Sequence, residues 1–392
     1  MHAIRAGLAG TDGLATETDL VRGLDLAPLE GFVFGGHEIR KGTLAASARE
    51  IHQLNGTIPY PLLDALRDEL AAVDRDIRPG TLVNAGATIR ALTKPGARVP
   101  KQAPKTLRDE VDRMAGDIRR FVAKHRLTRC ICVNLSSTEA PLTRKPAHRT
   151  TAALDELLDR PIDGRGVVSQ VRPSTLYAYV AASLRLPLVH FTPSDGALIP
   201  AITELFARHG APFIGADGKT GETLVKSSLA PMFRYRNLRV LTWQGYNILG
   251  DRDGVVLADA ANKQAKVATK DALLPQILGY PLHTHVGIDY VPSLHDLKTA
   301  WDFVHFRGFL GFKMAMQFIW QGCDAILAAP LVVDLVRFAD LAHRRGESGP
   351  MTHLACFFKQ PFGVDEHDLH TQWRMLTDYV AHAVADDGPK VD

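Results

Sequence analysis

The sequence predicts an α/β protein, a Rossmann-like doubly wound parallel sheet that carries an inserted α+β domain. Short apolar runs alternate with helices of about 10 to 15 residues between residues 104 and 215, which is typical of a parallel sheet. After about residue 225 strictly alternating runs replace them, as in a sheet that is covered on one face. The 392 residues also exceed the usual size of one hydrophobic core, so two domains are expected.

The composition is that of an ordinary soluble globular protein, with 46% hydrophobic and 23% charged residues. The net charge of +3 is too small to suggest a nucleic acid as a partner. No apolar run approaches the roughly 18 residues of a membrane helix, and the N-terminus lacks the apolar core of a signal peptide. The four cysteines form no Cys-x-x-Cys pair, so we expect free thiols and a cytoplasmic protein.

In chain order, the N-terminal part predicts mostly helix with two short strands. Residues 1–8 have helical spacing, and helical patches cover 41–75. Residues 29–34 are predicted as a strand that leads into Gly35-Gly36-His37-Glu38, where an acidic residue could bind ribose hydroxyls in a dinucleotide fold. An ordinary strand-to-helix turn explains these four residues equally well. Residues 81–84 are predicted as another short strand.

The central part predicts buried strands that end in polar loops. Loops 135–139 and 192–196 follow two of these strands, and ligands bind at the carboxyl ends of strands in open α/β sheets. Residues 141–173, rich in Pro and Arg, are predicted as an excursion or lid. The predicted strands are 130–134, 187–191 and 212–215, and the predicted helices are 104–124, 174–185 and one that ends near 209.

Residues 224–328 are predicted to form the inserted domain, and 1–223 with 329–392 the Rossmann-like domain. Between Phe312 and Trp320 large apolar residues alternate with others, which suggests a half-covered sheet and an oligomer interface. The alternation of helices and short apolar runs then returns. A helix is expected over 324–344, a strand over 354–358 and an amphipathic helix from about Leu369.

Three patterns resemble known sites but lack an essential part. Gly218-Lys219-Thr220 resembles the end of an ATPase phosphate loop, which needs a glycine where Phe213 stands. Gly7, Gly10 and Gly13 lack the strand that precedes a dinucleotide fingerprint. His283 and His285 have no third ligand at a recognisable spacing, so no metal site is predicted.

Lysines are the strongest sign of an anion site. Lys266 and Lys270 are four residues apart, so on a helix they would share one face, and two ammonium groups there would repel unless an anion lay between them. A solvated basic face explains that spacing equally well. Four further lysines lie in or beside apolar segments, where a lysine is costly unless it is paired or used: Lys219, Lys226, Lys313 and Lys359.

From about Leu29 to the C-terminal helix, the chain resembles the inositol-3-phosphate synthase (myo-inositol-1-phosphate synthase) family. No single motif is decisive, but their order and spacing together are specific. The motifs are Gly35-Gly36-His37-Glu38-Ile39, Ser137-Thr138-Glu139, Gly215-Ala216-Asp217-Gly218-Lys219-Thr220-Gly221, Tyr246-Asn247-Ile248-Leu249-Gly250, Asp253-Gly254, the pair Lys266 and Lys270, Cys323-Asp324 with Leu327-Ala328-Ala329-Pro330, and Lys359-Gln360-Pro361.

The resemblance implies an NAD-dependent isomerase of inositol biosynthesis that converts the sugar phosphate glucose 6-phosphate to inositol phosphate. In the family, C5 is oxidised, a proton leaves C6, an aldol step closes the ring at C1, and C5 is reduced again. The resemblance assigns Lys266, Lys270 and Lys359 to substrate oxygens and proton transfer, Asp217 and Asp324 to orienting those lysines, and Asn247 to substrate or nicotinamide. It also implies a homotetramer and NAD contacts from Gly35, Gly36, Glu38, Ser137, Thr138, Asp195, Asp217, Lys219 and Asp253.

Two departures from the family pattern bear on these expectations. The family's first strand and glycine-rich pyrophosphate loop have no counterpart before residues 1–8, which resemble the tail of the following helix. Either the true start lies upstream of Met1, which we favour, or NAD binding is impaired. Asp289 stands where eukaryotic members have a lysine, which leaves a related cyclitol phosphate open. The alternatives are an NAD-linked sugar-phosphate dehydrogenase and a cofactor-deficient, non-catalytic homologue.

Overall fold

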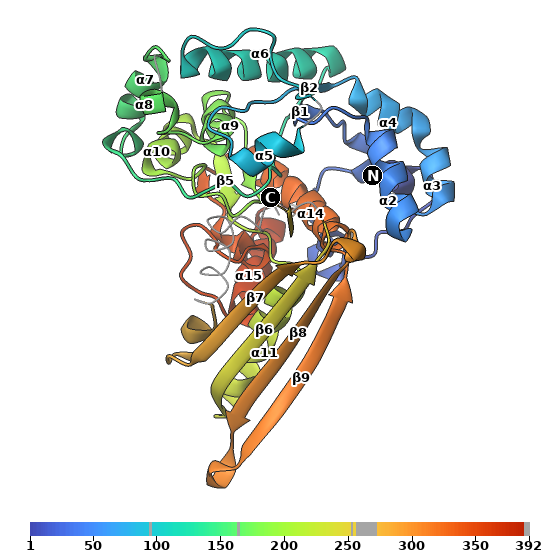
Figure 1. The fold of residues 1–392 in the computed structure, drawn as a ribbon, viewed down its shortest axis with the longest axis vertical. Coiled ribbons are helices and arrows are strands. Elements are labelled where there is room, and N and C mark those ends of the chain that lie inside the picture. Colours follow the sequence, from blue (N-terminus) through green and yellow to red (C-terminus); the bar gives the residue numbers. More distant parts are fainter. Residues whose placement is uncertain (94–95, 163–164, 252–253, 256–272, 388–392) are drawn as a thin grey trace, which may run out of the picture. The chain divides into compact units, whose positions relative to one another are not determined.

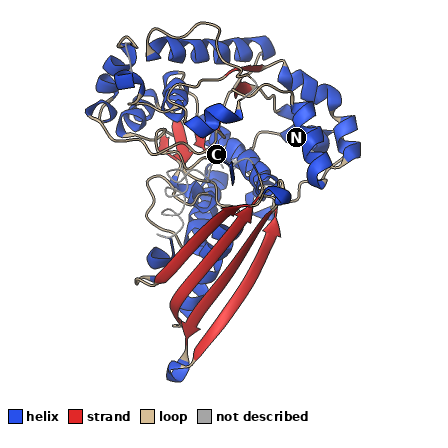
Figure 2. Ribbon diagram, in the orientation of Figure 1, coloured by secondary structure: helices blue, strands red, loops and turns tan. Residues whose placement is uncertain are grey.

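The computed structural model describes residues 1–93, 96–162, 165–251, 254–255 and 273–387. Contacts divide the chain into two compact units, shown as a ribbon in Figure 1 and by secondary structure in Figure 2. The first unit comprises Met1–Asp12, Asp25–Ile214 and Leu335–Met351, and the second comprises Gly13–Leu24, Gly215–Asp334 and Thr352–Asp392. These units are defined by contacts between residues, whereas the two predicted domains are defined by what they bind. The predicted domain boundaries therefore stay a prediction.

Short parallel strands form the sheets of the first unit. β1 (Gly36–Glu38) pairs in parallel with β2 (Ile77–Pro79). A separate sheet has the order β10-β5-β4-β3, in which β3 pairs with β4, and β5 with β10, in parallel. The α/β prediction is therefore confirmed. The strands of this sheet are β3 (Cys132–Asn134), β4 (Leu188–His190), β5 (Pro212–Gly215) and β10 (Gly349–Pro350).

Helices accompany these strands, as the alternating pattern predicts. Almost the whole of α9 is buried, and both α6 and α10 pack against it. Its apolar residues on every side explain this position at the centre of the unit. The helices are α1 (His2–Arg5), α2 (Leu44–Asn55), α3 (Tyr60–Ala65), α4 (Arg67–Asp74), α5 (Ala87–Leu92), α6 (Leu107–His125), α7 (Thr151–Asp159), α8 (Arg165–Val168), α9 (Pro173–Ser183) and α10 (Pro200–His209).

Helix α6 begins and packs as its sequence dictates. Thr106 and Asp109 form a capping box, in which each side chain binds the backbone N–H of the other residue. Leu107, Val111 and Met114 are buried on one face of the helix. The helix predicted over 104–124 is confirmed.

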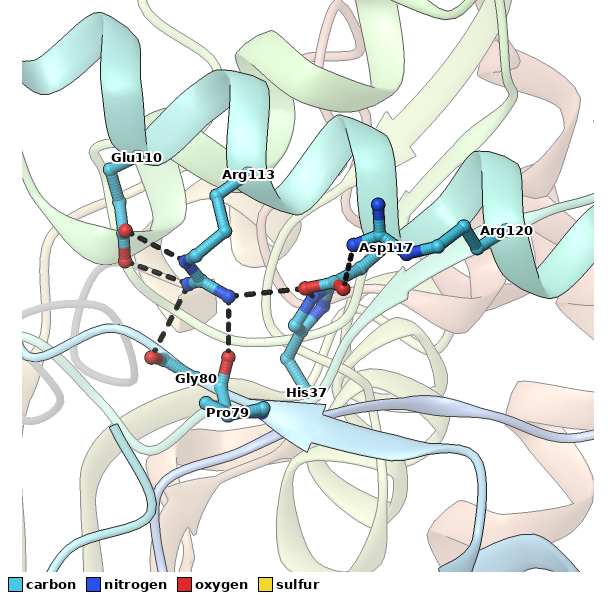
Figure 3. A network of polar contacts seen from close by, with 7 residues as sticks. All are labelled: His37, Pro79, Gly80, Glu110, Arg113, Asp117 and Arg120. Atoms are coloured by element: carbon cyan, nitrogen blue, oxygen red, sulfur yellow. Dashed lines mark hydrogen bonds and ion pairs between the residues drawn. The ribbon is translucent and has the colours of Figure 1, made fainter. Parts of the chain in front are cut away.

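A polar network fixes α6 to the end of β2 (Figure 3). Arg113 donates two hydrogen bonds to Glu110, at 2.8 and 2.9 Å, and one of 3.1 Å to Asp117. The same guanidinium donates to the carbonyl oxygens of Pro79, at 2.9 Å, and Gly80, at 3.4 Å. One side chain thus satisfies two buried carboxylates and two backbone acceptors at once.

Replacing Arg113 with methionine should lower the free energy of unfolding by about 3 kcal/mol, because Glu110 and Asp117 would then stay buried without this cation. Urea denaturation followed by circular dichroism measures the loss. Arg119→Met is the matched control, since Arg119 lies exposed on the same helix. Equal effects of the two substitutions would contradict the assigned role of the network.

Three predicted strands are wrong. Residues 29–31 form a 3-10 turn after Pro28, and pairing begins only at Gly36. Residues 81–84 form a turn with Asn84 at φ +51°, because the strand precedes them as β2. Residues 354–358 belong largely to a 3-10 helix, Thr352–Phe357. Apolar runs this short occur in turns and 3-10 helices as well as in strands, so periodicity alone could not distinguish strand from turn.

The segment 141–173, predicted as an excursion or lid, contains helix α7, which is packed into the first unit. Leu154, Leu157 and Leu158 of α7 are fully buried. Helix α7 contacts α10 and α6, which places it within the body of the first unit.

A four-stranded sheet of order β7-β6-β8-β9 dominates the second unit. β6 runs parallel to β7 and antiparallel to β8, and β9 is antiparallel to β8. Residues of β9 alternate between half-buried and exposed, which confirms the pattern predicted for 312–320. The elements are β6 (Arg239–Leu249), β7 (His283–Tyr290), β8 (Lys298–Arg307), β9 (Lys313–Gly322), α11 (Gly221–Tyr235) and α15 (Leu369–Asp387), with α14 (Asp324–Arg344) shared between the units.

The two faces of this sheet differ. A core cluster that includes Phe233 of α11, Trp243 of β6 and Val304 of β8 covers one face. On the other, Tyr246, Trp301 and Ile319 are neighbours in register across three strands, and Tyr246 stacks on Trp301 with ring centroids 5.8 Å apart. Ile319 is 67% exposed there. The second face is therefore an apolar surface open to solvent in a single chain.

A buried cluster of charges joins α11 to the sheet. Lys226 Nζ lies 2.5 Å from Glu222 Oε1 and 3.2 Å from Asp302 Oδ1. Trp243 Nε1 donates to the same Asp302 oxygen at 2.7 Å. A Cβ at Gly245 would lie 2.5 Å from Lys226 Nζ, so only glycine lets the chain pass so close. All three charged side chains are at most 3% exposed.

None of the helices in the described part of the chain is both long enough and apolar enough to cross a membrane.

Candidate active site

Two segments distant in the sequence run side by side in the second unit. Five backbone hydrogen bonds of 2.6 to 3.2 Å join loop 215–219, which precedes α11, to residues 357–362. Asp217 has φ +61°, a left-handed conformation that is rare outside glycine and less rare for Asp and Asn. The pairing therefore fixes an unusual turn and directs the Asp217 side chain.

Asp217 and Lys359 form a nearly buried ion pair across these segments. Their Oδ1 and Nζ atoms are 2.8 Å apart, and the side chains are 6% and 10% exposed. The second carboxylate oxygen of Asp217, Oδ2, is buried and has no hydrogen-bond partner within the described residues. A buried acceptor without a donor costs free energy, so this oxygen suits a donor group on a ligand.

Lys219, two residues further on, points into the unit. Its ammonium donates a 2.6 Å hydrogen bond to Gln372 of α15, and the side chain is 2% exposed. Burial lowers the pKa of Lys219 to about 8. A neutral partner and a lowered pKa let this lysine change its charge close to neutral pH, which an ordinary lysine does not do.

A second lysine–carboxylate pair lies where strand β8 of the four-stranded sheet begins. Lys298 begins β8, Asp324 begins α14, and their Nζ and Oδ2 atoms are 3.0 Å apart. A Cβ at Gly221, the first residue of α11, would lie 3.2 Å from Asp324 Oδ1, so this pair borders the loop that carries Asp217. Asn247 lies buried two residues before the end of β6, and its amide donates to Gly287 O at 3.4 Å.

In the first unit, the loops after β3 and β4 are tied together as neighbouring parallel strands require. The Glu139 N–H donates to Ser194 Oγ at 3.1 Å, and the Leu142 N–H donates to Asp195 Oδ1 at 2.9 Å. Ser137 is exposed in this loop and Thr138 is buried. The predicted residues Ser137, Thr138 and Asp195 therefore lie at one sheet edge.

Glu139 holds this edge to the start of α9. It accepts hydrogen bonds from the N–H of Ser174, at 2.9 Å, and from its hydroxyl. The carboxyl is 8% exposed, and burial raises the pKa of Glu139 to about 7. The folded protein therefore keeps a proton on this group that the unfolded chain releases near pH 4.5.

Because the folded pKa of Glu139 is raised, the native state binds more protons between pH 4.5 and 7, and this group's contribution to stability is lost as the pH rises through that window. Glu139→Gln, which keeps both partners on Ser174, should remove this dependence and stabilise the protein at pH 8 by up to about 3 kcal/mol. Thermal unfolding at pH 5 and pH 8, followed by circular dichroism, checks this. A gain of equal size at both pH values would refute the titration.

Glu38 ends β1, in the separate two-stranded sheet, and Gly35 and Gly36 precede it. Its Oε1 accepts from the N–H groups of Ile39, at 2.8 Å, and Arg40, at 3.0 Å. Its Oε2 accepts from Arg40 Nε, at 3.3 Å, and Nη2, at 3.1 Å. The predicted ribose-binding carboxylate is thus held in place by its own strand end.

Three other predicted site residues, Asp253, Lys266 and Lys270, lie outside the described residues. His283 and His285 are in β7, and the described part of the chain contains no group of three or more His, Cys, Asp or Glu that could hold a metal ion. Asp289 lies in β7 beside Ile248 of β6.

Sequence reasoning missed Lys298, Arg40 and Gln372. Lys298 is the first residue of an alternating strand, two residues after Asp296. Its position at the end of a strand could have identified it as a candidate site residue. No signal marked Gln372, because its role depends on a lysine 153 residues away in the chain.

Comparisons with known proteins agree with this arrangement. The family model described as myo-inositol-1-phosphate synthase, an NAD-binding family, matches residues 1–381. The chain is 33% identical over 376 residues to inositol-3-phosphate synthase 1 of Bacteroides thetaiotaomicron, covering 93% of this chain and 84% of that protein. It is 31% identical over 247 residues to inositol-3-phosphate synthase of Trypanosoma brucei brucei, 60% of this chain and 46% of that one. The chain thus spans only about half the length of that relative.

Two solved structures share the fold. Inositol-3-phosphate synthase from Caenorhabditis elegans has a TM-score of 0.82 at 21% identity, covering 96% of this chain and 78% of that one. A myo-inositol-1-phosphate synthase-related protein from Thermotoga maritima has a TM-score of 0.76 at 21% identity, covering 97% and 93%.

The described residues fit an NAD-binding family. Glu38 presents a half-exposed carboxylate at a strand end, and Asp217 Oδ2 is an acceptor without a donor within the described residues. The match along residues 1–381 and the 33% identity to a full-length relative show that this chain belongs to the myo-inositol-1-phosphate synthase family.

Proposed function

We propose that this protein is an inositol-3-phosphate synthase, which cyclises glucose 6-phosphate to myo-inositol phosphate with NAD as its cofactor. The observation that carries this proposal is two lysine–carboxylate contacts near the start of α11. Lys359 pairs with Asp217 in the loop before the helix, and Lys298 pairs with Asp324 beside Gly221. Such a site offers ammonium groups for substrate oxygens and carboxylates that orient them. Names of similar proteins support the same activity.

In the proposed reaction, charge develops on the C5 oxygen when the enolate forms. The ammonium of Lys359, held by Asp217, stabilises that oxyanion in a largely water-excluded place, where a fixed cation is most effective. Lys298 neutralises a second substrate oxygen or the phosphate. When bound, NAD would supply reversible hydride transfer at C5, so the reaction as a whole would have no net redox change.

The remaining predicted roles belong to this proposal. Lys266 and Lys270 bind substrate, Asn247 and Lys219 serve the nicotinamide side, and Asp253 contacts NAD. Residues 1–223 and 329–392 form the NAD-binding domain, and 224–328 form the catalytic and tetramerisation domain. A cytoplasmic location agrees with the four cysteines, all of which are free thiols.

The decisive test is to incubate the full-length protein with glucose 6-phosphate and NAD and to follow products by phosphorus and carbon NMR. The proposal expects an inositol phosphate without net NADH. NADH that accumulates with an open-chain product would identify a dehydrogenase instead. If the protein forms no product and does not bind NAD, it is a non-catalytic homologue.

The open face of the sheet supports a homotetramer. Tyr246, Trp301 and Ile319 form an apolar row there, and the adjoining hairpin tip exposes Phe309 and Leu310 by 88% and 90%. Apolar patches of this kind mark protein interfaces. Ile319→Arg should lower the molar mass measured by light scattering, whereas Trp373→Arg, on α15, should not. An unchanged mass for Ile319→Arg would exclude this face as the interface.

A further inference from the structure

The end of β1 carries an arginine that the proposed function does not use. In dinucleotide-binding folds, a carboxylate at such a strand end binds the ribose 2′-hydroxyl of NAD, whereas a nearby arginine accommodates the 2′-phosphate of NADP. This chain has both groups two residues apart, as Glu38 and Arg40.

Arg40 is held by Glu38 but keeps donors for a ligand. Its Nε and Nη2 atoms each donate one hydrogen bond to Glu38 Oε2. A guanidinium has five N–H groups, so three remain, and no side-chain contact within the described residues uses them. The side chains are 41% and 37% exposed, which leaves this edge open to a ligand.

The surroundings of Glu38 are basic. Lys41 is exposed and would lie 2.8 Å from a Cβ at Gly96. Arg98 donates its N–H to Ile39 O at 2.7 Å and its guanidinium to Gly42 O at 2.9 Å. Three cations thus gather around residues 38–42.

Two other carboxylates near this strand end have partners of their own. Asp74 accepts from the Leu44 N–H at 2.9 Å, and Asp117, 3.3 Å from His37 of β1, is paired with Arg113 and Arg120. Arg40, Lys41 and Arg98 lie within residues 38–42 or are hydrogen-bonded to them. A 2′-phosphate carries about −1.5 to −2 at pH 7, so it is attracted here, whereas a carboxylate alone would repel it.

We infer that the adenosine site of this protein accepts a 2′-phosphate, so that it binds NADP as well as NAD, and that Arg40 is the residue that decides between them. The inference rests on the proposed function in one respect, namely that a dinucleotide binds at the end of β1. Glu38 serves the 2′-hydroxyl of NAD, and Arg40, with Lys41 and Arg98 nearby, serves the 2′-phosphate of NADP.

Isothermal titration of the full-length protein with NAD and with NADP tests this without any turnover. We expect the two Kd values to lie within about tenfold of each other. Arg40→Met should weaken NADP at least about tenfold and change NAD less than about threefold. Arg40→Lys keeps the positive charge but lacks the forked guanidinium, so its Kd for NADP should lie between those of the wild type and Arg40→Met. Glu38→Gln should weaken NAD and tighten NADP.

Arg78→Met is the matched control. Arg78 lies on the neighbouring strand β2 with the same 41% exposure, but its partner in register is His37, so it is on the opposite face of the strand pair from Glu38. It should leave the ratio of the two Kd values unchanged.

Wild-type protein that binds NAD but binds NADP more than about a hundredfold more weakly would overturn this inference and leave the proposed function intact. An Arg40→Met protein with an unchanged ratio would overturn the role of Arg40. Wild-type protein that binds neither nucleotide would overturn both this inference and the assignment of NAD in the proposed function.

Discussion

Replacing Lys359 with methionine is expected to slow inositol phosphate formation by roughly a hundred- to a thousandfold, the usual effect of removing one fixed oxyanion donor. The ammonium of Lys359 is fixed by an ion pair, 2.8 Å from Asp217, and its side chain is only 10% exposed. Methionine has a similar length and keeps the packing, but it cannot stabilise charge on the C5 oxygen. Product formation at saturating substrate measures the effect, since a donor used in the transition state lowers kcat.

A loss of stability could imitate this result, because the substitution leaves the Asp217 carboxylate buried without its cation. The double variant Lys359→Met, Asp217→Asn removes that charge and should recover most of the stability while the rate stays low. Lys313→Met is the surface control, since Lys313 is exposed on β9. A double variant that recovers the rate as well would show that Lys359 acts only in the fold.

Replacing Lys226 with methionine is expected to lower the free energy of unfolding by about 3 to 5 kcal/mol, because it leaves two carboxylates buried without a cation. Glu222 and Asp302 are 1% and 0% exposed, and both contact Lys226. Burial raises the pKa of Asp302 to about 6 even in the presence of the lysine. Without Lys226 these groups should take up protons, so the loss should be larger at pH 8 than at pH 5.

Urea denaturation at both pH values, followed by circular dichroism, measures this loss. The triple variant Lys226→Met, Glu222→Gln, Asp302→Asn replaces the charges with neutral groups of similar shape and should recover most of the stability at pH 8. A single variant as stable as the wild type would mean that the cluster does not hold a charged lysine.

How far the sequence predicts this structure depends on the length of each element. The long helices α6 and α14 agree with their predicted ranges, because several turns of one apolar face leave no other conformation. The three-residue strands β1 and β2 were misplaced by several residues. Their positions depend on pairing with each other, and pairing across about 40 residues has no local signal.

The candidate site shows the same limit. Its residues could be identified one by one from a family resemblance, and Asp217 and Lys359 do lie together. The hydrogen-bond partners of the site residues could not be predicted. Gln372 contacts Lys219 from a distant helix, and Arg40, which binds Glu38, belongs to none of the family motifs. Contacts between distant segments set pKa values and orientation, and they exist only after folding.

The placement of the tryptophans has a practical consequence. All four (Trp243, Trp301, Trp320 and Trp373) belong to the second unit, and the first has none. Intrinsic tryptophan emission therefore reports on the second unit alone, whereas far-ultraviolet ellipticity averages over both. If the two signals change at different urea concentrations, the units unfold separately, and the effects of Arg113→Met and Lys226→Met can be assigned to their own transitions in one experiment.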